Sequence, residues 1–221
     1  MKNKVNVSDR CFTLMHSNIR GFDSKVVSLN SILGVIKPDV LTINETFLKN
    51  NRNIKIPGYE CFNLNRNDID GGGVATCVSN KDKSNTLNIF KGDIKTEILV
   101  TRHSQFERPI NVINFYGKVE SRSCVDSIQE QWAAVQDVVK KIEAKGELTV
   151  IVGDFNMKIG NLVQGNEDKK FSHGGKLLKD FLADEKYILV NGTKKCEGGP
   201  YTRIDPATGK KTILDLCVVS Q

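Results

Sequence analysis

The sequence predicts an α/β fold of two β-sheets with helices outside them. Short apolar runs bounded by turn residues alternate with longer amphipathic segments. Residues 59–64 and 73–79 are typical of neighbouring strands joined by a turn, whereas 11–45 and 110–153 each indicate a strand, a helix and a second strand. This mixture of hairpins and crossovers favours two sheets with helices outside them.

Short apolar runs rich in β-branched and aromatic residues predict the strands. Turn residues such as Pro57–Gly58, Gly71–Gly73 and Gly198–Pro200 separate them. The final stretch, PYTRIDPATGKKTILDLCVVS, is typical of a closing hairpin. The predicted strands are residues 11–16, 39–44, 59–64, 73–79, 86–90, 97–102, 110–115, 148–153, 187–190 and 213–219.

Three segments carry apolar residues at helical spacing, each on one face, so each helix should pack one side against a sheet. We find no linker, internal repeat or low-complexity segment and predict a single domain over residues 1–221. The periodic residues are Val26, Val27, Leu29, Ile32, Leu33 and Ile36; then Ile128, Trp132, Val135, Val138, Val139 and Ile142; then Leu177, Leu178, Phe181 and Leu182.

Composition narrows the class of protein. Lys plus Arg number 32 against 26 Asp plus Glu, and the net charge of +6 favours a polyanionic partner. No apolar stretch approaches the roughly 20 residues of a membrane helix, and the N-terminus lacks the apolar core of a signal peptide. The six cysteines show no metal-ligand spacing, so we expect reduced thiols in an intracellular protein that does not enter a membrane.

Two polar residues follow early strands and are candidates for chemistry. Asn18 ends the first strand in SNIRGF, although an Asn before a turn is more often a structural cap. Glu45 follows the apolar strand of KPDVLTINETFL. A carboxylate held at the end of a rigid strand is a suitable hard-oxygen ligand for a metal ion.

The strongest local signal is LTVIVGDFNMKIG, in which an apolar strand ends at Gly153 and presents Asp154 and Asn156 two residues apart. On an extended chain both side chains would project to one side, with Phe155 pointing into the core. An Asp can accept a proton from water, and an adjacent Asn can hold that water or steady developing charge. An ordinary turn is the alternative interpretation of Asp-x-Asn.

Later strands supply further candidates. Tyr116 ends a strand and could donate a hydrogen bond to a phosphate oxygen, although such a Tyr is usually packing. Asp215 lies in an apolar strand, where an unpaired carboxylate is costly, so it should have a dedicated partner. Asp70 and the three glycines after it do not precede a helix and favour a turn over a phosphate-binding loop.

The ordered set SNIRG, INET, IPGY with GGGVA, NFYG, GDFN, YT and LDLCVVS resembles the endonuclease/exonuclease/phosphatase superfamily over essentially the whole chain. Within this superfamily, the sequence is similar to the apurinic-type endonuclease domains of non-LTR retrotransposons. The segments that carry this similarity are IPGY with GGGVA, SNIRG and PDVLTINETFL. The resemblance implies a four-layered α/β sandwich of two facing mixed β-sheets with helices outside, and a site where strand-end loops converge at one edge.

The resemblance also implies roles for individual residues. Glu45 would be the principal ligand of Mg²⁺ or Mn²⁺, with Asn18 beside it. Tyr116 would contact phosphate, and Asp154 and Asn156 would activate and orient the attacking water.

On the substrate side, the resemblance places Thr202 near the DNA and gives Asp215 a supporting role behind the site. The loop residues Arg20, Arg66 and Arg203 are candidates for phosphate contacts. The family's Ser-Asp-His motif is absent before Gln221, and none of His16, His103 and His173 matches it. We therefore expect the last core strand and the catalytic histidine to be missing.

The implied activity is hydrolysis of a DNA phosphodiester to leave a 3′-hydroxyl that primes reverse transcription. That function implies double-stranded DNA as partner, a reverse transcriptase in the same longer polyprotein, a monomeric nuclease domain and action in the nucleus. Two alternatives stay open: a phosphatase of the same fold acting on a small or lipid phosphate, and a DNA-binding module without catalysis.

Overall fold

The computed structural model describes residues 11–67, 71–82, 86–92, 96–121, 123–164, 166–184, 187–197 and 201–221. Asp70 and the turn at Gly198–Pro200 lie outside these residues. The strands are β1 (Leu14–Asn18), β2 (Val40–Asn44), β3 (Tyr59–Leu64), β4 (Val74–Ser79), β5 (Thr86–Lys91), β6 (Ile98–His103), β7 (Ile110–Tyr116), β8 (Leu148–Asp154), β9 (Tyr187–Leu189), β10 (Arg203–Ile204), β11 (Lys211–Thr212) and β12 (Asp215–Ser220). The helices are α1 (Phe22–Ile36), α2 (Val125–Glu143) and α3 (His173–Asp184).

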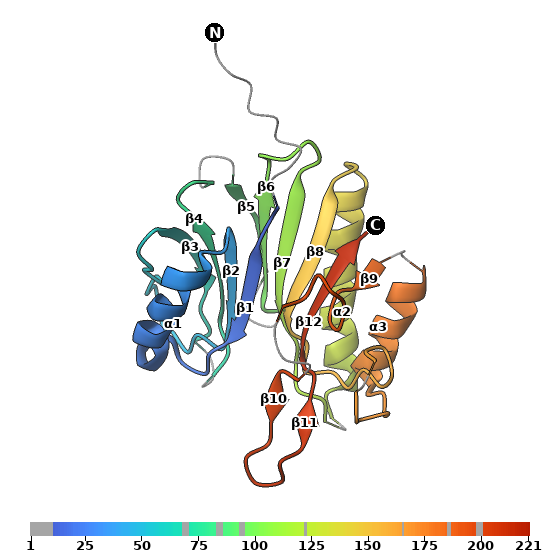
Figure 1. The fold of residues 1–221 in the computed structure, drawn as a ribbon. Coiled ribbons are helices and arrows are strands. Elements are labelled where there is room, and N and C mark those ends of the chain that lie inside the picture. The colour runs from blue at the N-terminus through green and yellow to red at the C-terminus, as the bar shows by residue number, and fades with distance from the viewer. Residues whose placement is uncertain are drawn as a thin grey trace.

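The chain forms the predicted four-layered sandwich (Figure 1). The first sheet has the order β1-β2-β4-β3 and is covered by α1, and the second has the order β5-β6-β7-β8-β12-β9 and is covered by α2 and α3. Both sheets are mixed, because β1 with β2 and β7 with β8 are parallel pairs joined through helices while their other pairs are antiparallel. The fold class predicted from the sequence is confirmed.

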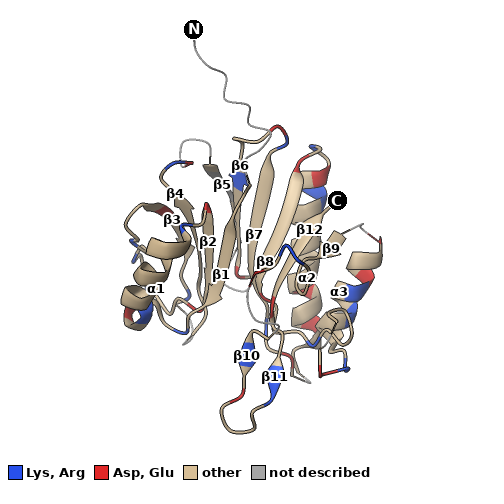
Figure 2. Cartoon of the chain, in the orientation of Figure 1, with Lys and Arg blue, Asp and Glu red and all other residues tan. Residues whose placement is uncertain are grey.

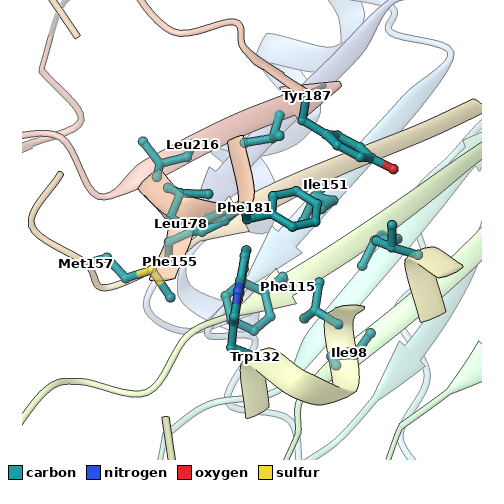
Figure 3. Packing of buried hydrophobic residues seen from close by; sticks show 14 of the residues in the cluster. Ile98, Phe115, Trp132, Ile151, Phe155, Met157, Leu178, Phe181, Tyr187 and Leu216 are labelled. Atoms are coloured by element: carbon teal, nitrogen blue, oxygen red, sulfur yellow. The ribbon is translucent and has the colours of Figure 1, made fainter. Parts of the chain in front are cut away.

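Alternation along the strands builds the separate apolar layers. Leu41 and Ile43 of β2 face α1, whereas Val40 faces the second sheet and meets Val112 and Val152 there. On the far side of the second sheet, aromatic residues of β7, α2, α3 and the position just after β8 pack edge to face (Figure 3). Each such buried side chain contributes roughly 1.5–3 kcal/mol to folding. The aromatic group comprises Phe115, Trp132, Phe155 and Phe181.

Register then brings distant motifs to one edge. Asn18 at the end of β1 lies opposite Asn44 at the end of β2. In the second sheet, Tyr116 of β7 pairs with Asp154 of β8, which pairs with Asp215 of β12. The polar residues that end these strands therefore share one end of the sandwich.

Two predictions from the sequence need correction. The closing hairpin is formed by β10 and β11, which pair only with each other in the described part of the chain, and Asp215 lies on the separate strand β12 between β8 and β9. Cys61 and Cys77 are not free thiols but form a disulfide. They are direct cross-strand partners on β3 and β4, with Cα atoms 4.0 Å apart, so their side chains share one face.

Within the described residues, no helix is both long enough and apolar enough to cross a membrane.

His103 is a fully buried histidine at the end of the second sheet away from Asp154. Its ring nitrogens contact the hydroxyls of Thr86 and Thr101 at 3.3 and 3.0 Å. Burial lowers its pKa from 6.5 to about 4, and Asp82 and Asp39 only partly oppose this effect. The folded protein therefore holds the neutral ring.

Because the folded-state pKa of His103 lies below the unfolded value, its contribution to stability is complete above about pH 6.5 and is lost as the pH falls toward 4. On acidification over that range, the free energy of unfolding should fall by up to about 3 kcal/mol less in His103→Gln than in the wild type. Urea unfolding at about pH 7 and about pH 4.5 measures the difference. Equal acid sensitivity of the two proteins would contradict the burial argument.

Candidate active site

Four polar side chains from both sheets meet at the shared edge. The Asn18 amide nitrogen donates to Glu45 Oε1 at 2.7 Å and to Asp154 Oδ2 at 2.8 Å. The Tyr116 hydroxyl donates to the same Glu45 oxygen at 3.1 Å. Residues separated by up to 136 positions in the chain thus form one hydrogen-bonded group.

The surroundings of this group affect its acid–base properties. Burial raises the pKa of Asp154, and the negative charge of Asp215 raises it further, against the hydrogen bonds from Asn18 and the Asn156 backbone N–H. Burial also raises the pKa of Tyr116, with Glu45 and Asp154 adding to the effect. Tyr116 therefore stays a phenol that donates a hydrogen bond, and Asp154 is a stronger base than an exposed aspartate.

The GDFN segment has a geometry that the sequence did not fully predict. A Cβ at Gly153 would collide with the Phe115 carbonyl, so only glycine allows β7 and β8 to pack this closely. Phe155 is fully buried, as predicted. Asn156, however, leaves the strand with φ +51°, and its N–H donates to Asp154 Oδ1 at 2.9 Å. The motif is thus an Asx-type turn, with the Asn156 side chain donating to the Gly117 carbonyl at 2.8 Å.

Asp215 has the dedicated partner that its apolar strand requires. His16 Nε2 lies 3.2 Å from Asp215 Oδ1, and His16 Nδ1 lies 3.0 Å from the Thr42 hydroxyl. Because a carboxylate only accepts hydrogen bonds, the proton of a neutral His16 ring belongs on Nε2. The Thr202 hydroxyl accepts from the Asp215 backbone N–H at 3.1 Å, which joins the β10–β11 hairpin to this strand.

The family model for the endonuclease/exonuclease/phosphatase family matches residues 15–209. The chain belongs to this family. Its fold is also that of solved structures. The catalytic domain of Xenopus laevis APE2 aligns with a TM-score of 0.74 at 18% identity, over 95% of this chain and 82% of that domain.

Two further structures have the same fold. The 3′ phosphatase NExo from Neisseria, bound to a product DNA hairpin, aligns with a TM-score of 0.70 at 18% identity, over 95% of this chain and 87% of that one. The endonuclease domain of TRAS1, a telomere-specific non-LTR retrotransposon, aligns with a TM-score of 0.65 at 15% identity, over 96% of this chain and 86% of that one. A comparison with curated proteins found no match.

The three arginines predicted to contact phosphate lie in different parts of the structure. Arg20 is exposed just after β1, and its N–H donates to Asn18 Oδ1 at 3.3 Å. Arg203 is exposed on β10. Arg66 is instead largely buried and pairs with Glu97 at 3.1 Å.

Sequence reasoning missed two residues that support the site. The Asn44 amide nitrogen donates to Asn114 Oδ1 at 2.8 Å across the two sheets, and Asn44 Oδ1 accepts from the Asp154 N–H at 2.7 Å. Both asparagines are fully buried in otherwise apolar strands. That placement was the available signal, because a buried amide needs partners.

The donor set suits a cation that binds through few protein ligands. Within the described residues, no group of three or more His, Cys, Asp or Glu side chains could hold a metal ion by itself. Glu45 is partly exposed, and Asn18 donates hydrogen bonds both to it and to a second carboxylate, Asp154. Mg²⁺ typically uses one or two carboxylates, water and substrate phosphate, which these residues allow.

The inter-sheet amide pair can be tested against a neighbouring polar residue. In the wild type, Asn114 donates to the Ala75 carbonyl at 2.7 Å and accepts from the Asn44 amide. Asn114→Leu would remove both hydrogen bonds. We expect a loss of about 2–4 kcal/mol in the free energy of unfolding, measured by urea denaturation. Thr76→Val on β4 is the control, because this fully buried hydroxyl makes no hydrogen bond within the described structure. A loss as small as that of the control would contradict the assigned role.

Proposed function

We propose that this chain is the metal-dependent endonuclease domain of a non-LTR retrotransposon, which nicks chromosomal DNA by phosphodiester hydrolysis. The supporting observation is the contact of Asn18 with both Glu45 and Asp154, because it places a metal-ligand carboxylate beside a basic carboxylate. The endonuclease domain of TRAS1 has the same fold and comes from such a retrotransposon.

The proposed reaction assigns a step to each side chain. Glu45 and Asn18 would hold a Mg²⁺ or Mn²⁺ ion, which would supply positive charge to neutralise the phosphate. Tyr116 donates a hydrogen bond from its hydroxyl to a phosphate oxygen. Asp154 accepts a proton from the attacking water as the water oxygen bonds to phosphorus and the P–O3′ bond breaks, and the leaving 3′-oxygen takes a proton from solvent. Asn156, fixed against Gly117, orients the water. Asp215, held by His16, supports Asp154 from the next strand.

The β10–β11 hairpin is the proposed DNA contact. It projects from the body of the domain and carries Lys and Arg on its strands (Figure 2). Asp205 fixes its turn by accepting from the N–H groups of Ala207 and Thr208 at 3.0 and 2.9 Å. The hairpin starts at Thr202, which also contacts Asp215, so DNA bound there would lie beside the reacting groups.

The biological setting is part of the proposal. The nick would leave a 3′-hydroxyl that primes a reverse transcriptase encoded in the same longer polyprotein. The domain would act as a monomer in the nucleus, where its chromosomal target lies.

The proposal predicts Mg²⁺-dependent conversion of supercoiled plasmid to open circles that DNA ligase can reseal, and inhibition by EDTA. Asp154→Ala should reduce the nicking rate by about 10²–10⁴-fold, because it removes the group that accepts the proton from water. Asp137→Ala is the control, since Asp137 is exposed on α2 and pairs with Lys141 of the same helix.

Other outcomes of this assay favour the alternatives. Duplex binding without nicking would favour a DNA-binding module. Hydrolysis of a phosphoinositide or sugar phosphate without nicking would favour a phosphatase, as in the protein of similar fold described as a mannosyl-6-phosphatase of Bacteroides thetaiotaomicron.

The hairpin role predicts a change in binding rather than in chemistry. The double variant Arg203→Ala with Lys211→Ala should weaken duplex binding about tenfold and reduce the slope of log affinity against log salt by about two. Fluorescence anisotropy at several salt concentrations measures both. The pair Lys140→Ala with Lys176→Ala, exposed on α2 and α3, is the control for equal charge loss. Equal effects of the two double variants would argue against a specific hairpin contact.

A further inference from the structure

Glu97, which immediately precedes β6, makes a set of contacts that the proposed reaction does not use. Its side chain is only 5% exposed. Its carboxylate accepts the Gly73 N–H at 2.7 Å with one oxygen and an Arg66 guanidinium N–H at 3.1 Å with the other. A buried carboxylate with two such donors holds both partners in fixed positions.

The glycine segment joins Glu97 to the chain that follows Glu45. The Gly73 carbonyl accepts from the Thr46 N–H at 3.1 Å, and the Gly72 carbonyl accepts from the Phe47 N–H at 3.0 Å. A Cβ at Gly73 would lie 2.5 Å from the Thr46 hydroxyl. The segment therefore fits closely between Glu97 on one side and the residues after Glu45 on the other.

Glu45 depends on this support because it ends a strand in a constrained conformation. Glu45 and Phe47 both have left-handed backbone conformations, with φ +55° and +56°. Such conformations cost free energy in residues other than glycine and persist where neighbouring contacts hold them. The hydrogen bonds from Thr46 and Phe47 to the glycine segment are contacts of this kind.

Glu97 also reaches the site through its backbone. Its carbonyl accepts from the Tyr116 N–H at 3.2 Å, and the Tyr116 hydroxyl in turn donates to Glu45. Glu97 thus borders both the segment of Glu45, the proposed metal ligand, and that of Tyr116, which would contact the phosphate.

We propose that Glu97, paired with Arg66, is a positioning residue that holds the Glu45 segment in its site geometry. Arg66 compensates the buried charge of Glu97, so it belongs to the support of the site rather than to its DNA surface. The inference rests on the proposed function in assigning the metal to Glu45, but the mechanical link can be tested without that assignment.

The second sheet contains a matched control pair. Glu147 and Arg102 form an ion pair at 2.7 Å with side-chain exposures of 9% and 26%, against 5% and 22% for Glu97 and Arg66. Glu147 immediately precedes β8, at the opposite end of that strand from Asp154. Loss of either carboxylate therefore has a similar electrostatic cost, but only Glu97 lies next to the site.

The test compares Glu97→Ala, Glu97→Gln and Glu147→Ala with the wild type by amide hydrogen exchange at Thr46, Phe47 and Gly73. Exchange at these amides should rise about tenfold or more in Glu97→Ala relative to Glu147→Ala, after correction for global stability. Glu97→Gln can still accept from Gly73 and should stay within about threefold of the wild type. Unchanged exchange in both Glu97 variants would overturn the proposal.

Titration with Mn²⁺ alone gives the functional readout. Glu97→Ala should bind Mn²⁺ about tenfold more weakly than the wild type, while Glu147→Ala binds it normally. Equal affinity of both alanine variants would overturn the link to the metal site even if both proteins are less stable. Absence of Mn²⁺ binding by the wild type would instead contradict the proposed function, and hydrogen exchange would still decide whether Glu97 holds the segment.

Discussion

The hydrogen bond between Asn44 and Asn114 fixes how the two sheets face each other at the site. Both amides are fully buried between apolar strands, where an unpaired amide would cost roughly 1–3 kcal/mol. The apolar contacts around them have no direction, so they tolerate sliding of one sheet over the other. The amide pair does not tolerate such sliding, and Asn44 Oδ1 also accepts a hydrogen bond from the Asp154 N–H. The relative position of Asp154 and the first sheet is therefore set by directional bonds.

Charge in the site is balanced by short-range donors. The carboxylates of Glu45, Asp154 and Asp215 lie at one edge, and the charge of Asp215 contributes to the raised pKa of Asp154. Asn18 donates to two of these carboxylates, and His16 contacts the third. A divalent cation at Glu45 and Asn18, as proposed, would lower the repulsion between these carboxylates. The donors meanwhile keep the carboxylate oxygens in defined directions.

Most of the fold could be predicted from the sequence because strand alternation and helical spacing are local patterns. The placement of Asp154 and Glu45 at one sheet edge was also predictable, since Asp154 ends an apolar strand and Glu45 directly follows another. His16 was not, because its partner Asp215 is 199 residues away and only the packing of the two sheets brings them together. The Asn156 turn was left open because a strand end and an Asx turn share the same residues.

The division between rigid strand ends and projecting loops also explains how one fold serves different substrates. The reacting groups sit on strands held by buried bonds, so the phosphate chemistry should vary little among family members. The β10–β11 hairpin has short, exposed strands, and Thr202 at its base bonds to the backbone of Leu214 and Asp215. Its outer residues can therefore change without moving Asp154. Choice of substrate depends on such loops, and for this chain the proposed preference for a nucleic acid over a small phosphate rests on the basic hairpin.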